Sequence, residues 1–165
     1  MIFIIKYDRI SVNIYEIFIR GEIMSFERLD RDNTLDNGAR SCVLLCNFNA
    51  KELKAVKNYA SILGLKEQIC LNSKNGDSII KDILEDNIDS NCEIGRKERA
   101  IIFNNIPNMK INMFIDNLKK IRINNVLKAV VTETSINWTL NEVIVNLLAE
   151  RTAIKNGDFS DLHKK

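Results

Sequence analysis

The side chains best able to bind a ligand gather at three points, each directly after a short apolar run of the chain. They are Asn47, Phe48 and Asn49 after the run at residues 42–46, Asn104 and Asn105 after the run at 100–103, and Thr132, Thr134, Asn137 and Trp138 after the run at 129–131. Amides and hydroxyls form good hydrogen bonds but are poor general bases near neutral pH. We therefore expect these residues to bind a ligand or a partner, and we identify no catalytic residue among them.

The patterns typical of enzymes and metal sites are missing. Glu133 is the one carboxylate in the three segments, and a single carboxylate cannot form an acid–base pair. No glycine-rich phosphate-binding loop follows an apolar run. The single histidine, His163, lies near the end of the chain, and the cysteines lack the spacing of zinc ligands. The sequence therefore predicts no metal and no cofactor, and it favours a protein that is not an enzyme.

Two of the cysteines, Cys42 and Cys46, fall in one expected strand. A four-residue offset puts them on the same face but about 13 Å apart, which is too far for a disulfide. Cys46 also precedes an expected helix N-terminus, which lowers the pKa of a thiol and makes a nucleophile conceivable. Residues 47–51 contain no arginine or histidine to assist it, so a buried structural thiol is the favoured interpretation. Free thiols fit a reducing compartment, and we expect a cytoplasmic protein.

The overall charge argues against two classes of partner. Lysine plus arginine number 24 and aspartate plus glutamate 22, and this net charge of +2 is too small to indicate nucleic acid or an anionic membrane. No apolar run is long enough to span a bilayer. We expect the small basic cluster of Lys119, Lys120, Arg122 and Lys128 to be the solvated end of a helix and its following loop. The expected partner is an unknown protein or small ligand.

Alternating strand and helix patterns position the three polar segments. Continuous apolar runs, typical of strands buried on both faces, occupy residues 42–46, 68–71, 100–103 and 129–131. Apolar residues with helical spacing follow each run, over residues 53–63, 79–84, 111–121 and 140–148. This pattern predicts an α/β fold: a small three-layer sandwich, flavodoxin- or receiver-like, whose four βα units form a four-stranded parallel sheet in the order 2-1-3-4. In such a sheet, all three polar segments would share one rim at the carboxyl ends of the strands.

Two helices carry clear end signals. Thr139 and Glu142 have the spacing of a capping box at the start of the last helix, and Trp138 is placed to act as a hydrophobic staple on it. An exposed Trp138 would instead serve as an anchor for a ligand or partner, and the two roles are compatible. Asn49 and Gly64 are expected to begin and end the first helix.

The first forty residues differ from the rest of the chain. Residues 20–24 can be encoded by AGA GGA GAA ATA ATG, a purine-rich ribosome-binding sequence directly ahead of a start codon. We therefore expect Met24 to be the true start and residues 1–23 to be a mis-called upstream extension. The alternative is a genuine strand or helix that packs on the domain. Residues 24–40 are expected to be a disordered linker, residues 41–155 a single α/β domain, and residues 156–165 a polar tail.

One segment carries a family resemblance. The pattern Ala-Val-Val-Thr-x-x-x-x-Asn-Trp-x-Leu at residues 129–140, together with Asn47 and Phe48, resembles the domain-of-unknown-function family 3783. This is an uncharacterised family of anaerobic Gram-positive bacteria, and the similarity would extend over about residues 41–155. It implies a small intracellular domain with no assigned activity, cofactor or catalytic residue. The turn at Asn104 and Asn105 lacks the glycine expected there in relatives, which puts a close backbone approach at that turn in doubt.

Together these patterns favour a non-catalytic cytoplasmic domain that binds a partner protein or small ligand through the rim at the strand ends. The competing hypothesis is a small enzyme, or a nucleotide- or phosphometabolite-binding module, that uses Thr132, Asn137 and a helix N-terminus at the same rim. A basic nucleic-acid binder is least favoured because of the small net charge.

Overall fold

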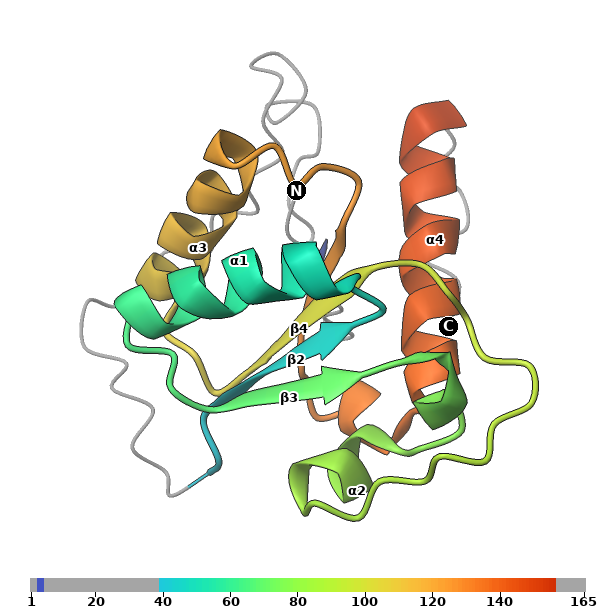
Figure 1. The fold of residues 1–165 in the computed structure, drawn as a ribbon. Helices are drawn as coiled ribbons and strands as arrows, with labels where there is room; N and C mark the ends of the chain where they lie inside the picture. Colours follow the sequence, from blue (N-terminus) through green and yellow to red (C-terminus); the bar gives the residue numbers. More distant parts are fainter. Residues whose placement is uncertain (1–2, 5–38, 157–165) are drawn as a thin grey trace.

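The structure is a computed structural model that describes residues 3–4 and 39–156 (Figure 1). Its strands are β1 (Phe3–Ile4), β2 (Cys42–Cys46), β3 (Gln68–Leu71), β4 (Ala100–Asn104) and β5 (Leu127–Val130). Its helices are α1 (Ala50–Ile62), α2 (Ile80–Leu84), α3 (Asn108–Lys120) and α4 (Leu140–Asn156), with the 3-10 helices η3 (Ser73–Asn75) and η4 (Ser135–Asn137). Each predicted strand–helix unit is present.

The described strands form one sheet in the order β1-β5-β4-β2-β3 (Figure 1). Helices α1 and α3 cover one face of this sheet, and α2 and α4 cover the other. The α/β class, the three layers and the order of the predicted strands, β3-β2-β4-β5, are therefore confirmed.

The strand directions differ from the prediction. β3 runs parallel to β2, and β5 runs parallel to β4, but β4 runs antiparallel to β2. The expectation of a purely parallel, flavodoxin- or receiver-like sheet is therefore wrong. The reason lies in the connection between β3 and β4. With five residues, α2 spans only about 8 Å, too little to return the chain along a strand of about 17 Å. The chain stays at one edge of the sheet and enters β4 in the opposite direction.

Alternate residues of the central strands face two separate cores. Leu44 and Ile102 point toward α2 and α4, whereas Val43 and Phe103 point toward α1 and α3. All four side chains are fully buried. Burial on both faces explains why these strands are continuous apolar runs and show no alternation of polar and apolar residues.

The predicted helix-end signals are confirmed. The Asn49 side chain accepts a hydrogen bond of 2.9 Å from the backbone N–H of Glu52 at the start of α1. Gly64, just beyond the end of α1, has a left-handed φ of 73°. At the start of α4, the Glu142 carboxylate accepts a bond of 2.7 Å from the Thr139 N–H, and the Thr139 hydroxyl accepts one of 3.2 Å from the Glu142 N–H. This reciprocal pair is the expected capping box.

The N-terminal strand β1 lies at one edge of the sheet. It pairs in parallel with β5, with Phe3 opposite Ala129. Whether residues 1–23 belong to the translated protein stays open between the two alternatives, because the pairing does not bear on the start codon. The expected start at Met24, the linker over residues 24–40 and the tail over residues 157–165 lie outside, or almost wholly outside, the described residues and stay predictions.

Phe103 and Phe114 lie at the centre of the core beneath α1 and α3. Both are fully buried, and their rings meet edge to face with centroids 5.6 Å apart. We predict that Phe114→Ala lowers the free energy of unfolding by about 3–5 kcal/mol, because it leaves a cavity and removes this ring contact. Urea denaturation measures the change. Met113→Ala, on the exposed side of the same helix, should change it by less than about 0.5 kcal/mol, and equal losses in the two variants would contradict this packing.

Glu150 is a half-buried carboxyl group of α4. Burial raises its pKa from an ordinary 4.5 to about 7. The folded protein therefore keeps this proton up to about pH 7, whereas the unfolded chain loses it near pH 4.5. Below about pH 4.5 the group is neutral in both states and does not oppose folding, whereas stability falls as the pH rises from 4.5 through 7 because the unfolded chain ionises more readily.

We predict that Glu150→Gln raises the melting temperature at about pH 8, where the wild-type protein must keep a partly buried charge. At about pH 4 the two proteins should melt almost together, because the carboxyl is then mostly neutral in both states. Differential scanning fluorimetry at the two pH values provides the measurement. Glu85→Gln, at an exposed position beyond α2, is the control. A gain for Glu150→Gln of equal size at both pH values would show that the charge is not responsible.

Candidate functional site

The antiparallel pairing of β2 with β4 divides the predicted rim between the two sides of the sheet at which the strands begin and end. We call the first of these sides the Cys46 edge: β2 and β3 end there, and β4 and β5 begin there. At the opposite edge, the Ser41 edge, β2 and β3 begin and β4 and β5 end. Asn47, Phe48 and Asn49 therefore follow a strand that ends at the Cys46 edge, whereas Asn104, Asn105 and residues 132–138 follow strands that end at the Ser41 edge. The expectation of one shared rim is wrong.

At the Cys46 edge, the predicted residues hold the backbone. Asn47 has a left-handed φ of 61°, and its side-chain amide donates to the carbonyl oxygens of Arg96 at 3.0 Å and Glu98 at 2.9 Å. It thereby fixes the segment that leads into β4. Asn49 caps α1, and Phe48 packs against the core beneath α1 and α3. Each of these three side chains has a structural contact.

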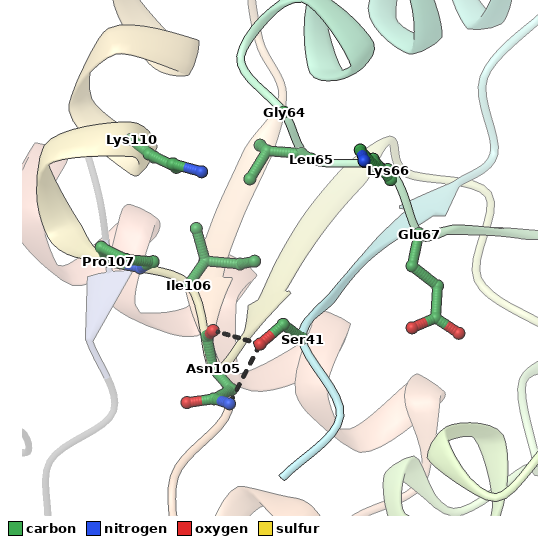
Figure 2. Close-up of a pocket in the computed structure, with 9 residues that line it drawn as sticks. All are labelled: Ser41, Gly64, Leu65, Lys66, Glu67, Asn105, Ile106, Pro107 and Lys110. Carbon is green, nitrogen blue, oxygen red and sulfur yellow. Dashed lines mark hydrogen bonds between the residues drawn. The ribbon is translucent and has the colours of Figure 1, made fainter. Parts of the chain in front are cut away.

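At the Ser41 edge, Asn104 and Asn105 tie the end of β4 to the segment that enters β2. The Asn104 amide donates to the Arg40 carbonyl at 2.5 Å. The Asn105 amide donates to the Ala39 carbonyl at 2.8 Å and to the Ser41 hydroxyl at 3.0 Å. The Ser41 hydroxyl in turn donates to the Asn105 carbonyl at 3.0 Å (Figure 2). Asn105 also adopts a left-handed φ of 53°, so it closes the turn after β4.

The polar segment after β5 is a hydrogen-bonded turn. The Thr132 N–H donates to the Ser135 hydroxyl at 2.9 Å, and the Ser135 N–H donates to the Thr132 hydroxyl at 3.2 Å. The Asn137 amide donates to the Glu133 carbonyl at 3.4 Å. Ser135 is buried. These polar residues therefore satisfy one another and bend the chain, which explains a segment longer than a simple strand-to-helix joint requires.

Beyond this turn, Trp138 attaches the segment to the α2 layer. Its side chain packs against the core shared by α2 and α4, and its carbonyl accepts a hydrogen bond of 2.9 Å from the Ile80 N–H. Thr134 is exposed, and its side chain makes no capping hydrogen bond to η4. Trp138 thus fulfils the expected structural role on the core next to α4.

A groove opens at the Ser41 edge between the α1–β3 turn and the start of α3 (Figure 2). Its volume is about 430 Å³. The lining residues are Ser41, Gly64, Leu65, Lys66, Glu67, Asn105, Ile106, Pro107 and Lys110. Of these, Leu65 and Ile106 are buried and give the groove an apolar floor. Asn105 is the predicted site residue that lines this groove.

Lys110 gives the groove its positive charge. Its ammonium group points toward Gly64, where a Cβ would lie 3.5 Å from the Nζ atom (Figure 2). Within the part of the chain that the structure describes, no carboxylate forms an ion pair with Lys110. Glu67, a carboxylate of the groove, is bound by Arg40, which also contacts Asp86 at 2.9 Å. Hydrogen bonds to Glu67 and Asp86 raise the pKa of Arg40, and this one cation is shared between the two carboxylates.

Sequence reasoning did not identify Lys110 or the turn Gly64–Glu67 as part of a site. In a purely parallel sheet, the α1–β3 turn would lie at the edge opposite the ligand rim. The available signal was the short apolar stripe over residues 79–84, which is too short for a returning helix. A connection without a returning helix allows a reversed β4, whose end then lies beside this turn.

The cysteines and the acidic residues add no second chemical site. Burial raises the pKa of Cys46 to about 12, which excludes a thiolate there near neutral pH and fits the structural interpretation. Cys42 lies with it in the core beneath α2 and α4. Among residues 3–4 and 39–156, no group of three or more side chains is arranged to hold a metal ion. None of the helices described combines the length and the apolar character needed to cross a membrane.

We predict that Asn47→Ala lowers the free energy of unfolding by about 2–3 kcal/mol, because alanine loses two hydrogen bonds and is strained at a positive φ. Asn47→Gly should lose less, about 1–2 kcal/mol, since glycine adopts this conformation without strain. Chemical denaturation of both variants provides the measurement. Equal losses would show that the left-handed backbone at this position contributes nothing.

The comparisons with known proteins found a matching family for one part of the chain. A family model described as a domain of unknown function (DUF3783) matches residues 99–154, which extend from the residue before β4 into the last turn of α4. No curated protein and no solved structure matches the chain. The matched segment is shorter than the expected residues 41–155; it contains Asn105 and Lys110 but not the α1–β3 turn. The resemblance to the domain-of-unknown-function family 3783 is confirmed over residues 99–154.

Proposed function

We propose that this domain is a non-catalytic binding module that holds an anionic group of its ligand in the groove at the Ser41 edge. The ammonium group of Lys110 carries the proposal, because it lies in the groove without a carboxylate partner among the residues described. An anion bound there can form charge-assisted hydrogen bonds with this ammonium group.

The neighbours of Lys110 support an anionic ligand. Lys66 adds a second cation to the lining. The first turn of α3 borders the groove, and the positive end of a helix dipole favours negative charge. Leu65 and Ile106 are almost fully buried and form the apolar base of the groove, so its exposed lining is mostly polar and charged. The two lysines are therefore the main attraction that the groove offers to an anion.

The competing function, a small enzyme or a nucleotide- or phosphometabolite-binding module, has weaker support. It relied on Thr132 and Asn137, whose side chains bond within their own turn. The groove also lacks an acid–base pair, since Glu67 is engaged by Arg40. The free cysteines, three of them buried, keep a cytoplasmic location as part of the proposal.

An NMR titration of the full chain with acetate and then with inorganic phosphate tests this proposal. We expect saturable shifts of the backbone amides of Gly64–Glu67, Asn105 and Lys110, because small anions should occupy the charged end of the groove even at low affinity. Lys110→Ala should abolish the shifts. Lys120→Ala, an exposed lysine at the other end of the same helix, should leave them unchanged.

Shifts that scatter over the surface, or that persist in Lys110→Ala, would contradict an anion site in the groove. A thermal-shift screen separates the competing function. Stabilisation by several degrees with nucleotides or phosphorylated metabolites, and none with simple carboxylates, would favour the nucleotide-binding alternative.

A further inference from the structure

Resting on the proposed function, we infer that the groove's ligand is a short peptide segment of a partner protein that combines acidic and large apolar side chains. The acidic side chain would meet Lys110, and the apolar side chains would cover the helix ends beside the groove. Two separate observations support this assignment: exposed apolar residues on α1 and α3, close in sequence to the lining, and the unmatched positive charge inside the groove.

Three large apolar side chains are exposed on α1 and α3, the helices that flank the groove, close in sequence to the residues that line it. Ile62, the last residue of α1, is 77% exposed and lies two residues before Gly64. Met109 and Met113 are 74% and 49% exposed, and they lie one turn apart on α3, on either side of Lys110 in sequence. Helices α1 and α3 pack against each other in one layer (Figure 1). Exposed apolar groups beside a binding groove are typical of protein interaction sites, and methionine adapts well to a partner's shape.

The charge of the groove selects an acidic partner. Neither Lys66 nor Lys110 forms an ion pair within the described part of the chain, whereas Glu67 is paired with Arg40, so these two lysines leave the groove with a positive balance. A basic segment would meet uncompensated repulsion, and a neutral one would leave Lys110 unpaired. Charge complementarity therefore requires the bound peptide to carry at least one aspartate or glutamate opposite Lys110.

The position of the apolar residues selects a peptide over a small molecule. Ile62, Met109 and Met113 do not line the groove; they lie within three residues of Gly64 or Lys110, which do. A small anion enclosed by the groove would leave them in water. A chain that extends beyond the groove can seat an acidic side chain at Lys110 and place its following apolar side chains on these residues, which would add to its binding free energy.

Selection of a displayed random peptide library on the immobilised full chain, with counter-selection on Lys110→Glu, tests the inference. We expect the enriched peptides to share an aspartate or glutamate within a few residues of Leu, Ile, Phe or Met. Enrichment of basic sequences, or no enrichment over the counter-selection, would overturn the inference.

Fluorescence polarisation with the most enriched peptide then tests the anion site and the apolar contacts separately. Lys110→Ala should abolish binding, and Met109→Ser combined with Met113→Ser should weaken it about tenfold. The double variant should keep the melting temperature, because both side chains are exposed, and should keep the acetate shifts. Peptide affinity within twofold of wild type in the double variant would overturn the peptide inference while leaving the anion site intact. If the wild-type protein showed no shifts on addition of acetate, both the anion site and the peptide inference would be wrong.

Discussion

The antiparallel pairing of β2 with β4 is the constraint on which the rest of the structure depends. These two strands form the centre of the sheet, and every residue of their ladder is buried except Asn104 at its end. A change of register or direction would therefore disturb both cores at once. The pairing also fixes which connections become neighbours. Because β4 ends where β2 and β3 begin, the α1–β3 turn meets the β4–α3 turn, and the groove lies between them.

The long connection before β4 keeps this arrangement in place by hydrogen bonds. The Asn75 amide donates to the Asp89 carbonyl at 2.9 Å, and the Arg96 N–H donates to the Asn141 side chain at 2.9 Å. The Asn47 amide then holds the last carbonyls before the strand. The segment has little helix or strand of its own, yet its backbone is bound at several points to η3, to α4 and to the end of β2. Such bonds define the entry into β4 without a returning helix.

Asparagine has an unusual share of this structural work. The chain has six glycines and one proline, and Asn47, Asn105 and Asn125 adopt left-handed φ values of 53–61°. Asparagine tolerates this conformation, and its amide can bond nearby backbone groups. Asn47 and Asn105 show both properties. This explains why the amide and hydroxyl side chains that follow the strands look, in the sequence, like a ligand-binding rim. Amides and hydroxyls after a strand look the same whether they face a ligand or bind their own backbone.

Local signals were predictable from the sequence, whereas the groove was not, because it depends on strand direction. Asn49 and the pair Thr139–Glu142 act within a few residues of themselves, so their spacing alone revealed two helix starts. Lys110 and Gly64 belong to different units and meet only because β4 is reversed. Gly64 then has two roles. Its positive φ ends α1, a local requirement visible in the sequence, and its missing side chain leaves open the space toward which the Lys110 ammonium points. A residue chosen for a helix end thus also shapes the charged end of the groove, so the folding requirement and the proposed binding site cannot vary independently at this turn.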